Sequence, residues 1–170
     1  MDASARRGDL KRVQEVFQCL QDLFSRTGDP RFKPNDECQK AMIIALAKKG
    51  AAAEAEGLLD ELVERTAVEQ NPRLMPKRNY FVDILVAWSK DKNEKVASEQ
   101  SQRVLMRILD LSKSGYPGLM PDSKCFERVM HALAKRRHQD SVRNIHSLLL
   151  CMEQVYNERG NESINLVLGL

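Results

Sequence analysis

The chain has 170 residues, which suits one domain with a buried core, and 42% of the residues are hydrophobic. Aromatic residues make up only 5%, a composition that favours helices packed through aliphatic side chains over an aromatic-rich β-fold. No apolar run is long enough to span a bilayer, residues 1–11 resemble neither a secretory signal nor a transit peptide, and the net charge of +3 does not by itself select a partner.

Residues 1–33 read as the later part of a helical unit. The segment 5–8 (Ala-Arg-Arg-Gly) matches 47–50 (Ala-Lys-Lys-Gly), and the two are 42 residues apart. A helix is expected over 14–24, followed by a linker over 28–33. The sequence therefore predicts a partial repeat over 1–33 that lacks most of its first helix.

One phrase with fixed internal spacing then recurs three times. In each copy a proline is followed, 14 residues later, by a lysine. This lysine ends a short segment of small and large apolar residues. The three pairs are Pro34 with Lys48, Pro76 with Lys90, and Pro121 with Lys135. The prolines are 42 and 45 residues apart, a period that indicates stacked supersecondary units. We expect repeats over 34–75, 76–120 and 121–163.

Each repeat reads as a first helix, a short turn and a second helix. In the repeat 34–75, Asn35 or Asp36 can cap the first helix and Gly50 can stop it, while the second helix is expected over about 52–66. In the repeat 76–120, Trp88 lies in the apolar stripe of the first helix, so core packing is favoured over base stacking. Alanines recur at one position of each first helix, where small side chains allow close approach: Ala45, Ala87 and Ala132.

The last part of the chain departs from a simple array. Residues 156–163 resemble another linker, and 164–170 form an apolar tail or the start of a further repeat. Neither end has the polar face of a capping repeat. We expect a single helical-repeat domain over 1–170 whose ends are covered by protein partners or by neighbouring repeats of a longer array.

Positive charge is concentrated in the first half of each repeat. The net charge is +1 over 34–50, +2 over 76–90 and +3 over 121–138, while the rest of the chain sums to −3. If the first helices line one face, that face is positive and suits a polyanion.

Over nearly the whole chain, these repeats resemble those of the pentatricopeptide repeat family. The resemblance rests on the proline start of each repeat, on an aromatic residue five positions later (Phe81 and Phe126, but Gln39 in the first full repeat), and on the lysine-glycine helix end. The long linkers are similar to those of algal and diatom members, as in the segment 28–30 (Gly-Asp-Pro). The resemblance implies an all-α, right-handed α-solenoid of helix-turn-helix repeats.

The resemblance also implies binding of single-stranded RNA in a mitochondrion or plastid, with roles in RNA processing or in a ribonucleoprotein scaffold. In the family, bases are read by the sixth residue after the proline and by a residue that directly follows a proline. The sixth residues are Lys40, Val82 and Glu127, and the residues after the prolines are Asn35, Lys77 and Asp122. None of the resulting pairs matches the family's base-reading combinations, so we expect no clear base specificity.

Phosphate contacts are expected from basic residues of the first helices and their turns: Lys40, Lys77, Lys48, Lys49, Lys90, Lys135, Arg136 and Arg137. The four cysteines form no C-x-x-C pair, and neither a Gly-rich phosphate loop nor a catalytic motif is visible. The sequence thus favours a binding protein without metal, cofactor or small-molecule substrate over an enzyme. The alternative is a structural subunit of a large assembly, such as an organellar ribosome, with mainly protein–protein contacts.

Overall fold

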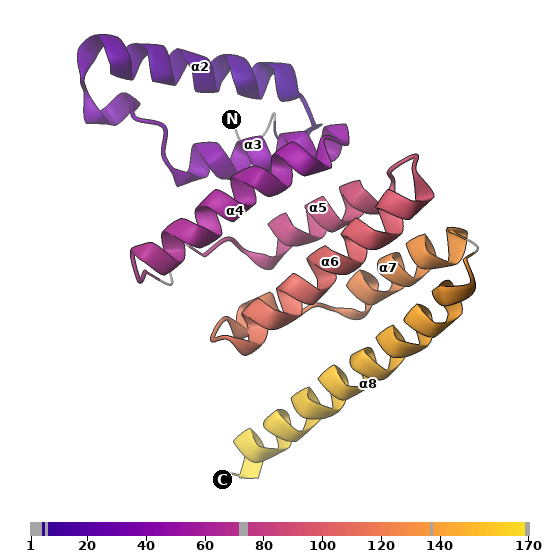
Figure 1. Cartoon of the computed structure of the whole chain (residues 1–170). Helices are drawn as coiled ribbons and strands as arrows, with labels where there is room; N and C mark the ends of the chain where they lie inside the picture. Colours follow the sequence, from indigo (N-terminus) through magenta and orange to yellow (C-terminus); the bar gives the residue numbers. More distant parts are fainter. Residues whose placement is uncertain (1–4, 6, 72–74, 137, 169–170) are drawn as a thin grey trace.

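The computed structural model of the chain is all-helical, as the sequence predicts (Figure 1). It describes residues 5, 7–71, 75–136 and 138–168, and of residues 158–168 it describes the backbone alone. The described residues contain α-helices and short 3-10 turns and no strand. The α-helices are α2 (Leu10–Thr27), α3 (Asp36–Lys49), α4 (Ala52–Val68), α5 (Arg78–Ser89), α6 (Glu94–Lys113), α7 (Ser123–Lys135) and α8 (Gln139–Leu168).

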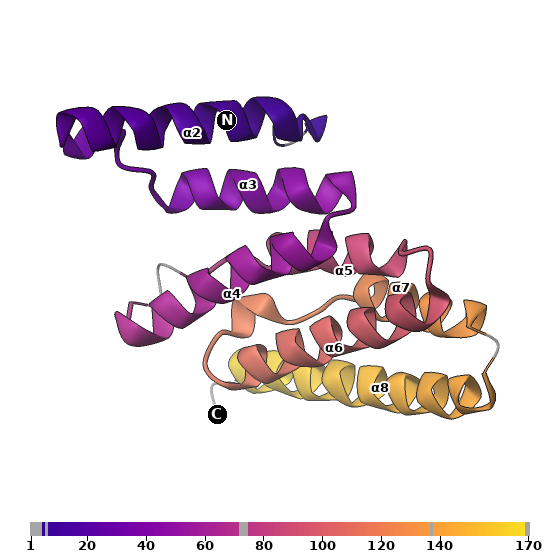
Figure 2. The same cartoon turned by 45° about the horizontal axis from the view of Figure 1, so that its top comes forward.

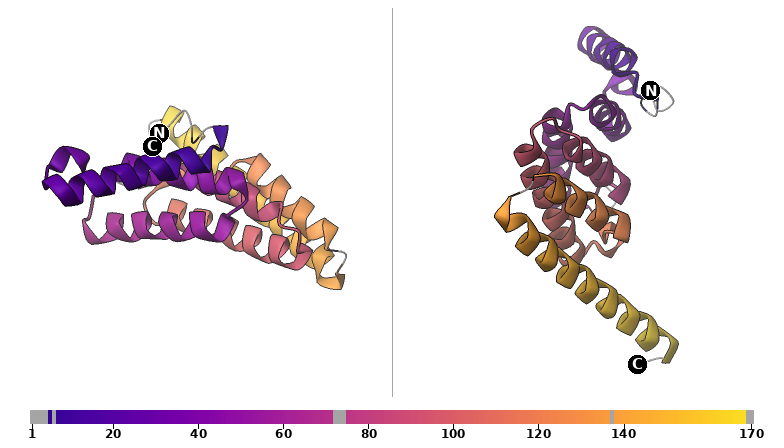
Figure 3. Two further views of the ribbon diagram at one scale, coloured as in Figure 1. Left: turned by 90° about the horizontal axis from the view of Figure 1, so that it is seen from above. Right: turned by 90° about the vertical axis from the view of Figure 1, so that its right-hand side faces the viewer.

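Consecutive helices pack as hairpins that follow one another in chain order (Figures 1 and 2). The hairpins are α3 with α4, α5 with α6, and α7 with α8, and α2 packs on α3. The first helices also contact one another directly, α3 with α5 and α5 with α7. Seen from the side, in the right panel of Figure 3, the helices form a row with α2 at one end and α8 at the other.

Two short turns shape the connections between units. The 3-10 turns η1 (Pro30–Phe32) and η3 (Pro117–Leu119) each begin at a proline and end shortly before the proline that starts the next repeat. Proline suits the start of such a turn because the first residues of a helix make no intrahelical hydrogen bond through their N–H groups. Proline, which has no N–H, therefore loses no hydrogen bond there.

Glycine ends the first helix of the first full repeat, as predicted. Gly50 has φ +86°, its N–H donates to the Ala47 carbonyl, and the Ala51 N–H donates to the Leu46 carbonyl. This pair of bonds is a Schellman motif, which needs one residue in the left-handed backbone conformation. Glycine adopts this conformation without steric strain. Gly8 has φ +75°, and a Cβ at Gly8 would lie 3.3 Å from Cβ of Lys48. The matching segments 5–8 and 47–50 therefore end side by side.

The core runs the length of the stack through the buried faces of these helices. Phe81 and Phe126, predicted at equivalent positions, are fully buried, as are the recurring alanines Ala45, Ala87 and Ala132 within a few per cent. Trp88 is half-buried against the core, and its indole N–H donates to Oε2 of Glu56 at 2.8 Å. The prediction that Trp88 packs in the core is confirmed.

The expected linker over 156–163 is wrong, because α8 continues as one helix through these residues to Leu168. The described connections between the earlier units contain a proline, whereas 156–163 contains Gly160 and no proline. A lone glycine weakens a helix by about 1 kcal/mol without stopping it. The apolar segment 164–170 therefore begins within α8, and residues 169–170 lie outside the described residues.

The second helices α4 and α6 are linked by side chains rather than by close backbone packing. The buried carboxylate of Glu56 in α4 accepts from Arg103 Nη2 of α6 at 2.8 Å as well as from Trp88. One helical turn later, Arg107 of α6 pairs with Asp60 of α4. These bonds join the hairpin of α3 and α4 to the hairpin of α5 and α6.

We expect Glu56→Ala to lower the free energy of unfolding by about 2 kcal/mol, because it leaves the half-buried Trp88 N–H without its acceptor. The measurement is chemical denaturation followed by circular dichroism. The control is Glu61→Ala on the exposed face of α4, which should change stability by less than about 0.5 kcal/mol. Equal effects of the two substitutions would contradict this role for Glu56.

Candidate nucleic-acid interface

The residue after each repeat proline lies at the N-cap of a first helix. Asn35 Oδ1 accepts from the Cys38 N–H at 3.1 Å, and Asp122 Oδ1 accepts from the Cys125 N–H at 3.2 Å. Lys77 occupies the same position and makes no capping hydrogen bond. Two of the three predicted base-reading partners therefore use their side chains to hold a helix end.

Asp122 is also tied to the preceding repeat. Its Oδ2 lies 3.7 Å from Nη2 of Arg78, and Arg78 Nη1 donates to the Met120 carbonyl at 3.1 Å. Partial burial disfavours the Asp122 carboxylate, but the hydrogen bonds from Cys125 and the Arg78 charge together lower its pKa. The carboxylate therefore remains ionised, and its hydrogen bonds and ion pair are made with groups of the protein itself.

The sixth residues after the prolines differ in how exposed their side chains are and in whether these side chains are already paired. The Lys40 side chain is only 15% exposed and its Nζ lies 2.8 Å from Oε1 of Glu37. Val82 is half-buried against the core, whereas Glu127 is exposed. Lys40 and Asn35 line one small pocket of about 330 Å³ together with Tyr80 of the next first helix.

The lysines at the ends of the first helices are brought together by the stacking. Lys48, Lys49 and Lys90 line one groove of about 700 Å³ between the ends of α3 and α5. Lys90 also lines the adjoining groove of about 430 Å³ with Lys135, between α5 and α7. We call Lys48, Lys49, Lys90 and Lys135 the lysine row. Four of the predicted phosphate-binding residues thus lie along two neighbouring grooves.

The grooves contain residues that the sequence analysis did not select. Lys92 adds a positive charge to the first groove, and Arg128 and His131 line the second beside Lys135. Positions 128, 131 and 135 are spaced i, i+3 and i+7, which places them on one helix face. That spacing was the available signal for Arg128 and His131, whereas Lys92 lies in a turn without such a pattern.

Three carboxylates lie among these positive charges: Asp83 and Asp91 line the first groove, and Glu127 lines the second. Asp83 of α5 lines the first groove and is half-buried. Burial raises the pKa of Asp83, and the positive charge of Lys48 partly opposes this shift. Asp83 therefore reduces the positive potential of the groove when it is ionised.

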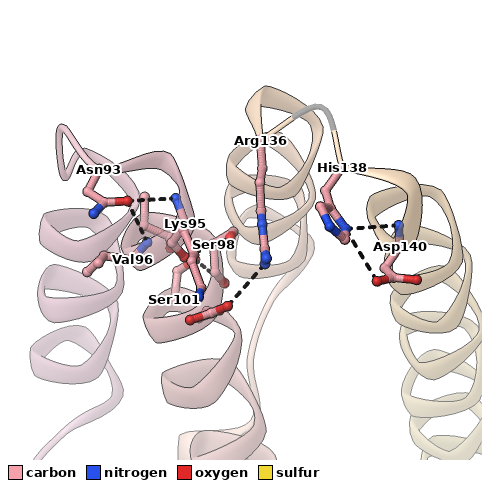
Figure 4. Close-up of polar contacts among 10 residues, drawn as sticks. Asn93, Lys95, Val96, Ser98, Ser101, Arg136, His138 and Asp140 are labelled. Carbon is pink, nitrogen blue, oxygen red and sulfur yellow. Dashed lines mark hydrogen bonds and ion pairs between the residues drawn. The ribbon is translucent and has the colours of Figure 1, made fainter.

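Arg136, which directly follows α7, does not join the lysine row. The side chain of Arg136 extends toward α6, where Nη1 lies 3.2 Å from Oε1 of Glu99 (Figure 4). Arg136 is thus placed to fasten α7 to α6. Arg137 lies outside the described residues.

In the described part of the chain, no group of three or more His, Cys, Asp or Glu side chains could hold a metal ion, and no helix is long and apolar enough to cross a membrane. Burial, with the hydrogen bond to Asp122, raises the pKa of Cys125 to about 11, so this thiol stays protonated at neutral pH.

Comparison with protein families, curated proteins and solved structures finds no match to this chain.

We expect Asp83→Asn to raise the unfolding midpoint at pH 7, because it removes a charge that burial disfavours. The raised pKa means that the folded state binds the proton more tightly than the unfolded state. The advantage of the variant should therefore shrink as the pH falls through the raised pKa of Asp83. Thermal unfolding between pH 7 and pH 3 measures this.

The control is Asp91→Asn in the exposed turn that follows α5, which keeps the side-chain oxygen that accepts from the Asn93 N–H. We expect no pH-dependent gain from this control. A gain from Asp83→Asn that grows toward acid pH would contradict the argument.

Proposed function

We propose that the protein binds single-stranded RNA along the ends of its first helices, as a pentatricopeptide-type, right-handed α-solenoid of a mitochondrion or plastid. In this proposal it serves RNA metabolism as a binding module and not as an enzyme. The proposal joins the sequence resemblance to the placement of the lysine row.

The single observation that carries this proposal is the recurrence of a lysine at one repeat position, in adjoining grooves. Lys48, Lys90 and Lys135 each follow a repeat proline by 14 residues, and each lies at the end of a first helix. Because the first helices contact one another, these ends form one continuous edge of the stack. A polymer with regularly spaced negative charges can follow such an edge.

Contacts of this kind position a nucleic acid without reading its sequence. A lysine ammonium binds phosphate as a point charge and does not distinguish bases. Three of the candidate base-reading side chains, Lys40, Asn35 and Asp122, are engaged within the protein. The proposed binding is therefore electrostatic and has little base preference.

A second candidate function is that of a structural subunit with mainly protein contacts. The specific observation in its favour is that Val82 packs against the core while Lys40 pairs with Glu37. Base-reading positions committed to the fold suit a chain that uses its repeats as a scaffold.

We expect the triple substitution of Lys48, Lys90 and Lys135 by Gln to weaken binding of single-stranded RNA at least about tenfold at low salt. Each phosphate contact contributes about 0.7 to the slope of log affinity against log salt for single strands, so the slope should fall by about 2. Fluorescence anisotropy with a labelled oligonucleotide, titrated at several salt concentrations, measures both effects.

The matched control removes three exposed lysines from the second helices, namely Lys11, Lys95 and Lys113. This variant has the same net charge as the first one. We expect it to keep most of the affinity and of the salt slope. Equal losses in both variants would show that only net charge matters and would refute a binding edge.

The scaffold function predicts a different result for the intact protein isolated from cells. Its partners should remain bound after nuclease treatment, whereas partners held through RNA should be released. Retention of the same proteins after complete RNA digestion, together with no RNA affinity at low salt, would favour the scaffold over RNA binding.

A further inference from the structure

One face of α8 carries large apolar side chains that the described structure leaves open. Val142, Leu149 and Tyr156 are spaced seven residues apart and are 75%, 43% and 38% exposed. Between them, Ile145 and Met152 are half-buried because they pack partly against the chain's own core, so the open part of the face is at Val142, Leu149 and Tyr156. Together these five residues, which we call the α8 stripe, have the a and d spacing of a coiled-coil seam over two heptads.

The equivalent positions of the preceding second helices are buried and mostly small. The three second helices can be aligned by their buried positions. In this alignment, residues 142, 145, 149 and 156 of α8 correspond to four residues of α6 and to four residues of α4. The α6 set is Ser98, Ser101, Leu105 and Ser112, and the α4 set is Ala52, Ala55, Leu59 and Thr66. All eight of these side chains are buried.

On α6 this face meets the following unit. The Ser112 hydroxyl donates to Sδ of Met120 at 3.6 Å, in the connection that leads to α7, and α6 contacts both η3 and α7. Small side chains on this face allow the next hairpin to approach closely. The larger Val142, Ile145 and Tyr156 of α8 would hold a hairpin of the same kind further away.

The long, straight course of α8 suits a different partner. Its 30 residues make it about 45 Å long, and it extends past the other helices toward its C-terminal end (Figure 3). A seam of large a and d residues on such a helix packs against another helix by inserting side chains between those of the partner.

We propose that the α8 stripe pairs with the α8 stripe of a second copy of this chain, antiparallel and about a two-fold axis. This arrangement places Leu149 of one copy against Met152 of the other, and Ile145 against Tyr156. Such an interface is the same patch used twice, so it closes as a dimer.

The polar residues beside the stripe fit this pairing. His146 and Glu153 are both exposed and lie at equivalent heptad positions along one border of the stripe. In the antiparallel register that pairs Leu149 with Met152, His146 of one copy lies opposite Glu153 of the other, and this happens twice. An imidazole N–H can donate to the carboxylate in each case.

The first test is the mass of the full chain in solution, by sedimentation velocity over a range of protein concentrations. We expect a dimer, and we expect Leu149→Glu to raise its dissociation constant by at least about a hundredfold. The control is Met106→Glu on α6, where the side chain is 41% exposed, close to the 43% of Leu149. Circular dichroism checks that both variants are folded.

A monomeric full chain at about 100 µM would overturn the proposal. So would equal weakening by Leu149→Glu and Met106→Glu. A monomer that uses the stripe to bind another protein or a further helical hairpin would overturn it as well.

A charge exchange tests the antiparallel register with exposed residues alone. His146→Glu should weaken the dimer by placing two carboxylates opposite each other, and Glu153→Lys should weaken it by removing the acceptor. The double variant His146→Glu with Glu153→Lys should restore association, because each new glutamate then faces a lysine of the other copy. Additive weakening in the double variant would overturn the pairing.

Discussion

The close packing of successive first helices is the constraint on which the rest of this structure depends. The helices α3, α5 and α7 contact one another in order, and a buried alanine recurs on each of them. A small side chain at this position lets two helices approach more closely than a leucine or valine would. Each alanine is followed three residues later by a lysine, on the same side of the helix and one turn nearer its end. The alanine position therefore determines where the lysine lies.

In the proposed function, the alanines serve folding and the neighbouring lysines serve binding. A lysine in the last turn of a helix is favoured by the negative end of the helix dipole, by about 0.3–1 kcal/mol at an exposed position. Its ammonium group still reaches the groove between two helix ends. Because the stabilisation by each lysine is small, loss of the lysine row should affect binding far more than folding. The alanines have the opposite balance, since enlarging a buried side chain costs about 1–3 kcal/mol.

The sequence predicted the elements that depend on local chemistry. The spacing of the prolines and lysines indicated the helices, and the roles of Asn35 and Gly50 as cap and stop follow from short-range hydrogen bonds. The wrong prediction over 156–163 also concerns local chemistry, because this segment resembles a linker but has no proline to end the helix. The pairing of Lys40 with Glu37 has the i, i+3 spacing of a helical ion pair and was open to prediction.

Other features depend on which helices lie side by side, and these the sequence could not show. Asp83 lines the groove of Lys48 and Lys90 because α5 packs beside α3. Arg136 pairs with Glu99 because α7 packs beside α6. The α8 stripe is distinctive only when its residues are compared with the buried faces of α4 and α6. Each of these required the register between helices, which composition and periodicity do not determine.

In the proposed function, the lysine row, rather than net positive charge alone, contacts the nucleic-acid backbone. The most direct measurement is lysine footprinting, in which acetylation rates of all lysines are compared by mass spectrometry with and without single-stranded RNA at low salt. We expect protection of Lys48, Lys49, Lys90 and Lys135, and unchanged acetylation rates at Lys11, Lys95 and Lys113. Uniform protection of all lysines, or none in the lysine row, would contradict it.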